Sequence, residues 1–226
     1  MLSNIVVVIP VYNEAATIGG LVETLVHGGC KVIVDDGGST DGSQSIARAA
    51  GASVLPRPQG VGPLRSIIND VALIDKLATL GTEFIITMDA GGTHDPVSAL
   101  FMKAACDAGS QALILGTRPL SKEWHGPRTL LSRVAAKLLG VPDATCGLRC
   151  YPFWMWQGLS GMLRNRTGFT FHFVVLGLIQ RLWPATMILH MHIPYKVVGK
   201  TSLNWKAIGY AARAMIMLKL GKVPTC

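Results

Sequence analysis

Acidic side chains follow three apolar runs of the sequence, each at the point where the run ends. These residues are Glu14, Asp36 and Asp89, and the runs before them are 4–10, 32–34 and 84–88. Short runs rich in Val and Ile predict buried strands. The carboxyl ends of parallel strands meet at one edge of a sheet, where open α/β sheets bind ligands. Carboxylates beside small residues suit a divalent cation and the phosphates of a nucleotide, whereas ordinary loops that cap helices are the alternative.

The apolar pattern also predicts the elements that hold these residues. Strands are predicted at 4–10, 32–34, 52–55, 84–88 and 112–115, and helices at 15–27, 43–50, 66–80 and 96–108. Strands that alternate with helices indicate a mostly parallel α/β sheet with helices on both faces.

Composition narrows the class of protein. The 226 residues are 50% hydrophobic with a net charge of +8, which favours anionic partners such as nucleotides or acidic lipids. Nucleic acid is not expected, because the charges do not interleave with aromatic residues. No run reaches the ~18 apolar residues of a spanning helix, and Met1–Pro10 reads as a strand rather than a signal peptide. We therefore expect a cytoplasmic protein that sits peripherally on a membrane.

The sequence holds five cysteines, an odd number. Cys146 and Cys150 are four residues apart, but no second Cys/His pair completes a zinc site. Reduced thiols are the expectation.

Three motifs carry a resemblance to a known family. Val7–Glu14 (V-V-I-P-V-Y-N-E), Val34–Gly42 (V-D-D-G-G-S-T-D-G) and Met88–Pro96 (M-D-A-G-G-T-H-D-P) resemble the opening signatures of family-2 inverting glycosyltransferases with the GT-A fold. The similar group is the dolichol-phosphate mannose synthase type, which moves a sugar from a nucleotide to a polyprenyl phosphate. Segments at 116–118, 128–133, 143–149, 168–173 and 193–203 extend the resemblance over most of the chain.

The resemblance implies a role for individual residues. The base and ribose of a GDP- or UDP-linked sugar would be framed by Pro10, Tyr12, Glu14, Val34 and Asp36. Asp89 and Ala90 would face the diphosphate and its Mg²⁺ or Mn²⁺, with Lys196 near the diphosphate where the family usually has arginine. Arg118, Arg128 and Ser132 would hold the acceptor phosphate, and Asp89, Arg118 and Arg128 would be the catalytic set.

Elementary chemistry agrees with the acceptor assignment. Forked guanidinium groups suit a doubly charged phosphate. Arg128 and Ser132 stand at i and i+4 and therefore lie on one helical face. A solvated basic face is the alternative for these arginines.

The cation motif departs from the family pattern. The usual D-A-D is Asp89-Ala90-Gly91 here, so the second carboxylate is missing and Asp89 is the one predicted metal ligand. A single carboxylate with phosphates and waters suffices for weak Mg²⁺ binding, and Thr93, His94 and Asp95 are further candidates.

The sequence thus predicts a GT-A (Rossmann-like) domain over residues 1–203 and a basic amphipathic helix over 204–226. That helix would lie on a membrane surface, or else dock on the domain or on a second copy. The predicted reaction moves a hexose, of mannose or glucose type, to a dolichyl or undecaprenyl phosphate with inversion. A non-lipid acceptor and a catalytically impaired nucleotide-binding module are the alternatives.

Overall fold

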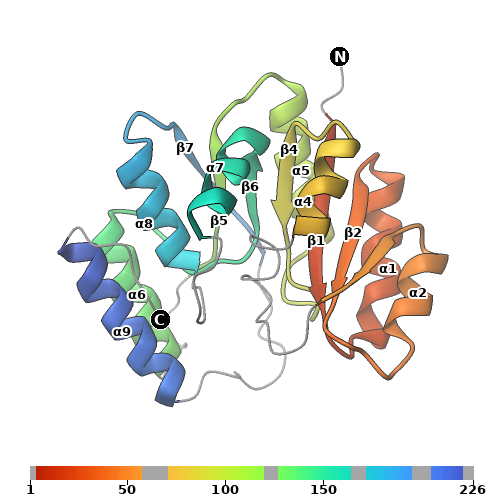
Figure 1. The fold of residues 1–226 in the computed structure, drawn as a ribbon, viewed down its shortest axis with the longest axis horizontal. Helices are drawn as coiled ribbons and strands as arrows, with labels where there is room; N and C mark the ends of the chain where they lie inside the picture. Colours follow the sequence, from red (N-terminus) through yellow and green to blue (C-terminus); the bar gives the residue numbers. More distant parts are fainter. Residues whose placement is uncertain (1–3, 58–70, 120–126, 164–171, 195–204, 221–226) are drawn as a thin grey trace.

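A computed structural model describes residues 4–57, 71–119, 127–163, 172–194 and 205–220. These described residues form one sheet of seven strands in the order β3-β2-β1-β4-β6-β5-β7, with helices on both sides (Figure 1). The strands are β1 (Ile5–Val11), β2 (Lys31–Asp36), β3 (Ser53–Pro56), β4 (Phe84–Thr87), β5 (Leu113–Thr117), β6 (Arg149–Pro152) and β7 (Ile188–His192). The helices are α1 (Ala15–His27), α2 (Ser43–Ala49), α4 (Val71–Thr79), α5 (Pro96–Asp107), α6 (Pro127–Leu139), α7 (Phe153–Leu163), α8 (His172–Leu182) and α9 (Trp205–Lys219).

Alternate residues of β1 feed two hydrophobic cores. Val6 and Val8 join the core beneath α4, α6, α7 and α8, whereas Ile5, Val7 and Ile9 join the core beneath α1 and α5. Successive side chains of a strand point to opposite faces, so a continuous apolar run is buried on both sides. The predicted α/β fold with helices on both faces is therefore confirmed.

One strand runs against the others. β6 lies between β4 and β5 and is antiparallel to both. Its register pairs Thr87 of β4 with Arg149 of β6. This strand was not predicted from the sequence, because its residues stand at the edge of an aromatic-rich segment with no strand pattern. Its consequence is that the residues before Arg149 run alongside the residues after Thr87.

The last described helix docks on the domain. α9 contacts α6 and α8, Ala214 is buried, and Leu218 reaches Gly177 of α8. Ile216 and Leu220 remain exposed. None of the helices in the described ranges is long and apolar enough to cross a bilayer. The division into residues 1–203 and 204–226 remains a prediction.

Candidate active site

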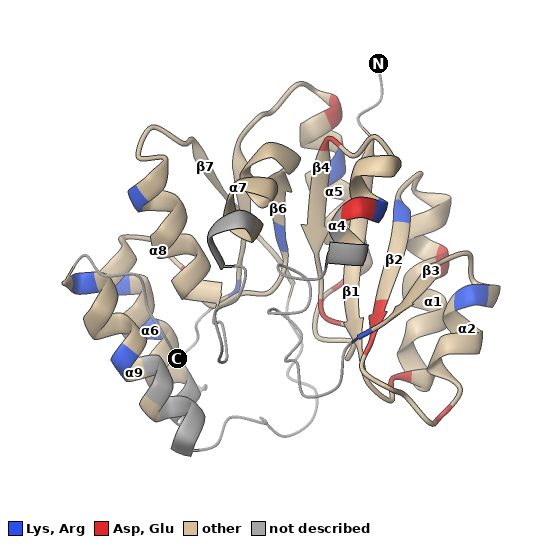
Figure 2. Cartoon of the chain, viewed as in Figure 1, with Lys and Arg blue, Asp and Glu red and all other residues tan. Residues whose placement is uncertain are grey.

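The carboxyl ends of β1, β2 and β4 place the predicted acidic residues at one edge of the sheet. Acidic residues, coloured red on the ribbon, lie near the lower ends of β1 and β2 (Figure 2). Glu14 stands directly before α1, Asp36 ends β2, and Asp89 comes two residues after β4. Partial burial raises the pKa of Glu14, and the negative charges of Asp41 and Asp89 raise it further against a hydrogen bond from Thr17. Glu14 and Asp89 therefore lie close enough for their charges to interact.

A cleft of about 510 Å³ opens beside this edge. Its walls are Tyr12, Asp36, Gly37, Gly38, Gln44, Pro56 and Arg57. Tyr12 is 61% exposed, so its ring is available to a ligand. Two residues predicted to frame a nucleotide, Tyr12 and Asp36, thus line one cavity. Val34 does not line it, because its side chain is fully buried in the core, and Pro10 lies beside Asp35 in the sheet.

Asp36 organises the loop that forms one wall of the cleft. Its Oδ2 accepts hydrogen bonds from the backbone N–H groups of Gly38 (2.9 Å) and Ser39 (3.0 Å) and from Nε2 of Gln44 (2.8 Å). Its Oδ1 accepts from Oγ of Ser39 at 2.5 Å. Burial alone would raise the pKa of Asp36, but these hydrogen bonds outweigh it and lower the pKa. Asp36 stays charged and holds the turn in shape.

An ion pair missed by the sequence analysis closes the other wall. Arg57 Nε lies 2.8 Å from Asp35 Oδ2, and Arg57 Nη2 donates to the Asp35 carbonyl at 2.8 Å. The two side chains are 8% and 2% exposed. β3 pairs with β2 so that Pro56 lies beside Asp36, which brings Arg57 back over the end of β2. No local pattern signals a contact between residues so far apart in the chain.

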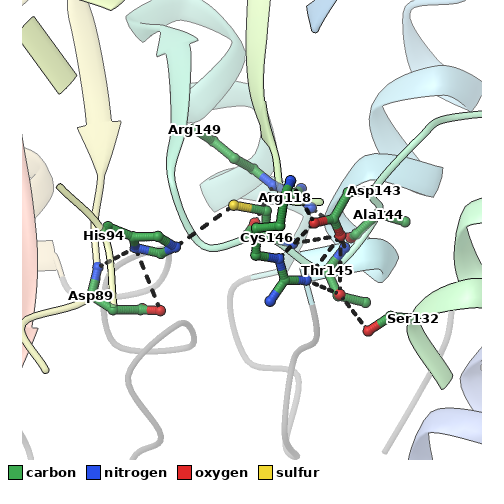
Figure 3. A network of polar contacts seen from close by, with 9 residues as sticks. All are labelled: Asp89, His94, Arg118, Ser132, Asp143, Ala144, Thr145, Cys146 and Arg149. Carbon is green, nitrogen blue, oxygen red and sulfur yellow. Dashed lines mark hydrogen bonds and ion pairs between the residues drawn. The ribbon is translucent and has the colours of Figure 1, made fainter. Parts of the chain in front are cut away.

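Asp89 is held between a glycine and a histidine. A Cβ at Gly147 would lie 2.9 Å from Asp89 Oδ1 and 3.0 Å from Oδ2, so only glycine leaves room for this carboxylate. Asp89 Oδ2 is 3.8 Å from Nδ1 of His94, which also accepts from the Asp89 N–H at 3.4 Å. On its other side, His94 Nε2 is 3.7 Å from Cys146 Sγ (Figure 3). The Asp89 side chain is nevertheless 50% exposed and faces solvent.

The further cation candidates have other surroundings. Asp95 is exposed and caps α5, accepting a hydrogen bond from the Val97 N–H at 2.9 Å. His94 is 2% exposed and lies beneath Asp89. The Thr93 hydroxyl is buried without a hydrogen-bond partner among the described residues. Ala90 is buried, and its carbonyl accepts from Thr17 Oγ1 at 2.8 Å.

Two of the predicted acceptor residues meet in a buried network. Arg118 donates to both oxygens of Asp143, from Nε at 2.6 Å and from Nη2 at 2.9 Å, and to Oγ1 of Thr145 at 2.6 Å. Oγ of Ser132 lies 2.7 Å from the same Thr145 Oγ1 (Figure 3). Burial alone would raise the pKa of Asp143, but the hydrogen bonds and charge of Arg118 lower it. The structure therefore joins Arg118 and Ser132, with much of the Arg118 fork committed to Asp143.

The remaining predicted site residues cannot be placed as side chains. Lys196 and the side chain of Arg128 lie outside the described part of the chain, although Arg128 belongs to the first turn of α6. Their roles stay predictions.

The loop 143–149 connects the two halves of the site. Asp143 and Thr145 contact the Arg118 half, whereas Cys146 and Gly147 contact the Asp89 half. Arg149 braces this loop from within. It is fully buried and donates to the carbonyls of Cys146 (2.9 Å), Ala144 (2.6 Å) and His172 (2.8 Å). Residues 143–149 belong to the segments that carry the family resemblance, but no role was predicted for them from the sequence.

Comparison with known proteins identifies the family. A sequence model described as Glycosyl transferase family 2 matches residues 6–129, more than half of the chain. The chain belongs to glycosyl transferase family 2. The matched segment contains both the residues that line the cleft and Asp89, and the predicted family and GT-A fold are confirmed.

Two named proteins are similar in sequence to this family 2 chain. Polyprenol monophosphomannose synthase of Mycolicibacterium smegmatis is 29% identical over 164 residues, which cover 64% of this chain and 60% of that protein. Glycosyltransferase AglJ of Haloferax volcanii is 28% identical over 164 residues, which cover 71% of this chain and 48% of that protein. The chain thus covers less than two thirds of the length of either relative.

Solved structures of glucosyl-3-phosphoglycerate synthase from Mycobacterium tuberculosis share the fold. The complex with phosphoglyceric acid has a TM-score of 0.71 at 19% identity and covers 99% of this chain and 81% of that chain. The complex with Mg²⁺ and uridine diphosphate has a TM-score of 0.70 at 19% identity, over 99% and 80% of the two chains.

Proposed function

We propose that this family 2 glycosyltransferase moves a hexose, of mannose or glucose type, from a GDP- or UDP-linked donor to a polyprenyl phosphate with inversion. The observation that carries the proposal is the loop 143–149, which joins a carboxylate site beside a nucleotide-sized cleft to the Arg118–Ser132 network. Two substrates that react with each other need two adjoining subsites, and this loop is shared by both halves.

The donor would occupy the cleft and the adjoining carboxylate edge. Tyr12 is exposed at the wall and is suited to stack on a base, while Asp36 orders the glycine turn beside it. Small residues at Gly37 and Gly38 let a ligand approach the backbone closely.

The residues at the edge fit a divalent cation bound together with the donor. Gly147 leaves room for the Asp89 carboxylate, a hard oxygen ligand of the kind that Mg²⁺ and Mn²⁺ prefer. Within the described ranges, no group of three or more His, Cys, Asp or Glu side chains could hold a metal by itself. Such an ion would take its other ligands from diphosphate and water, and it would neutralise charge on the departing diphosphate.

The proposed transfer requires alignment of the donor and the acceptor phosphate rather than a strong general base. An oxygen of the acceptor phosphate attacks the anomeric carbon, the bond from that carbon to the donor diphosphate breaks, and its electron pair leaves with the nucleotide. A phosphate monoester is already ionised near neutral pH, so no side chain has to remove a proton. Arg128 would hold this phosphate, and the Arg118–Asp143 pair would keep the adjoining wall rigid.

A basic, partly apolar surface favours a lipid acceptor. α6 and α9 lie side by side (Figure 1). Their exposed apolar residues are Leu130, Val134 and Ile216, with Leu220 directly after α9. Their exposed basic residues are Arg133, Lys137, Arg213 and Lys219. Apolar side chains with flanking lysine and arginine suit peripheral binding to anionic lipid. The cytoplasmic leaflet supplies such lipids, and we place the enzyme there.

A soluble phosphorylated acceptor is the second candidate. The structural neighbour solved with phosphoglyceric acid shares the fold over nearly the whole chain, at a TM-score of 0.71. A catalytically impaired nucleotide-binding module is the third, because Gly91 removes a carboxylate from the usual motif.

Sugar transfer assays separate the three candidates. Purified protein is incubated with labelled GDP-mannose or UDP-glucose and either undecaprenyl phosphate or 3-phosphoglycerate, with Mg²⁺, Mn²⁺ or EDTA. We expect label in the lipid fraction, and loss of turnover in Asp89→Ala and Arg128→Ala but not in Arg48→Ala, an exposed control on α2. Label in 3-phosphoglycerate alone would favour the second candidate, and nucleotide binding without any transfer would favour the third.

A further inference from the structure

Packing does not require a glycine at position 91, where the usual motif has a carboxylate. Gly91 is absent from the glycines with positive φ, whereas Gly92 has φ of 71°. A Cβ at Gly91 would have Glu14 Oε1 as its nearest neighbour at 3.4 Å, followed by Oε2 at 3.8 Å, which are ordinary contacts. Any side chain at position 91 would therefore begin against the carboxylate of Glu14.

Glu14 is held in this place but its carboxylate is not used to cap α1. The Glu14 side chain makes no capping hydrogen bond, and the Ala15 N–H is satisfied instead by Asp41 Oδ2 at 2.9 Å. The Glu14 backbone N–H donates to Ser43 Oγ at 2.8 Å, which fixes the start of the helix. Thr17 Oγ1 lies 2.8 Å from the Ala90 carbonyl and 3.5 Å from Glu14 Oε2, so it ties the Glu14 turn to the loop after Asp89.

We propose that Glu14 supplies the second carboxylate that Gly91 lacks, so that the cation of the donor complex lies between Asp89 and Glu14 and binds only together with the nucleotide. This inference rests on the proposed function, since it concerns the donor cation of that site. Two carboxylates leave most of the ligand positions of Mg²⁺ or Mn²⁺ to phosphate oxygens and water. The ion would therefore bind weakly until a diphosphate supplies the rest.

The consequence is an order of binding. Because Asp89 and Glu14 leave most ligand positions to the diphosphate and water, the cation enters as a complex with the donor. Glu14 would then act on the diphosphate through the ion, in place of the base and ribose contact that the sequence predicted for it.

Titration with Mn²⁺ tests this proposal without an activity assay. The electron paramagnetic resonance signal of the free ion measures how much Mn²⁺ remains unbound. Wild-type protein should bind little Mn²⁺ alone and should bind it when UDP or GDP is present, after subtraction of binding by free nucleotide. Without nucleotide, Gly91→Asp should bind Mn²⁺ at least about tenfold more tightly than wild type. Tenfold is the lower end of the change in metal affinity that is typical for residues supporting a metal site. Gly91→Ala adds the same Cβ without a carboxylate and should behave as wild type.

Glu14→Gln separates the two roles of Glu14. Its Mn²⁺ affinity in the presence of UDP or GDP should fall by about tenfold or more, whereas its nucleotide affinity in EDTA should equal that of wild type. Unchanged Mn²⁺ affinity, or an equal loss of nucleotide affinity in EDTA, would overturn the proposal. Failure of both nucleotides to bind wild-type protein would instead refute the proposed donor site. Circular dichroism melting checks that each variant is folded, and Gly91→Asp tests a gain that no folding defect can mimic.

Discussion

Gly147 lies directly against the carboxylate of Asp89, where a Cβ would come within 2.9 Å of Oδ1. The pairing of β4 with β6 explains this contact. Thr87 pairs with Arg149 in an antiparallel register, and continuing that register by two residues brings Asp89 opposite Gly147. A hydrogen bond from Thr87 Oγ1 to the Gly147 carbonyl, at 2.7 Å, fixes the approach. β6, which was not predicted from the sequence, therefore shapes the space around Asp89.

Gly147→Ala should strongly reduce activity while leaving the protein folded. The added methyl group would displace the Asp89 carboxylate, which is half exposed and can turn away without unpacking the core. We expect kcat/KM for sugar transfer to fall about 100-fold, as for other small displacements in active sites, with a change in unfolding free energy below about 1 kcal/mol. Transfer assays and urea unfolding measure the two effects. Activity equal to wild type would show that Asp89 does not need this position.

Tyr12→Ala should weaken nucleotide binding without affecting stability. Tyr12 is 61% exposed at the wall of the cleft, so its ring contributes little to the core. Loss of stacking on a base costs about 1–3 kcal/mol, and Tyr12→Phe keeps the ring and should bind as wild type. Isothermal titration with UDP and GDP measures the affinity. Equal affinity in the alanine and phenylalanine variants would place the base elsewhere.

Asp143→Ala should strongly destabilise the fold. The change leaves the buried Arg118 guanidinium without its ion-pair partner and removes the acceptor for the Thr145 and Cys146 N–H groups. Breaking a buried pair by removing one partner costs about 3–5 kcal/mol. Urea unfolding measures the loss. Asp75→Asn, at an exposed position of α4, is the control and should stay within about 0.5 kcal/mol of wild type.

Stability should fall with pH below about 6.5, in part because of His172. Burial lowers the pKa of His172 well below its usual value, and the positive charges of Arg149 and Arg118 lower it further against the attraction of Asp143. The folded protein therefore keeps His172 neutral, while the unfolded chain takes up a proton as the pH falls through about 6.5. The unfolding free energy should drop by up to about 1.4 kcal/mol per pH unit from this residue.

The matching experiment compares urea unfolding at pH 7.5 and 5.5. His172→Gln should lose less stability between these two values than wild type does. His27→Gln removes an exposed histidine of α1 and should keep the wild-type difference. The same pH dependence in all three proteins would assign the effect to other groups.

Local sequence patterns determined the strands and helices of the amino-terminal half. The apolar runs at 4–10, 32–34 and 84–88 became β1, β2 and β4, and the polar residues after them reached one edge of the sheet. Such patterns are readable because the core face of a strand or helix is set by the period of its own residues. The motifs around Glu14, Asp36 and Asp89 likewise led to the family that the comparison identifies.

Tertiary structure alone decided which groups these residues meet. Arg57 pairs with Asp35, Asp143 engages Arg118, and Gly147 confines Asp89, each across more than twenty intervening positions. Such contacts depend on strand order and register, which no single segment encodes, and β6 enters the sheet antiparallel although its residues carry no strand pattern. The sequence by itself therefore determined the family, the fold class and the edge at which the acidic residues gather. The packing of distant segments determined how each carboxylate is held, because charge pairing and steric room arise only between chain segments that folding brings together.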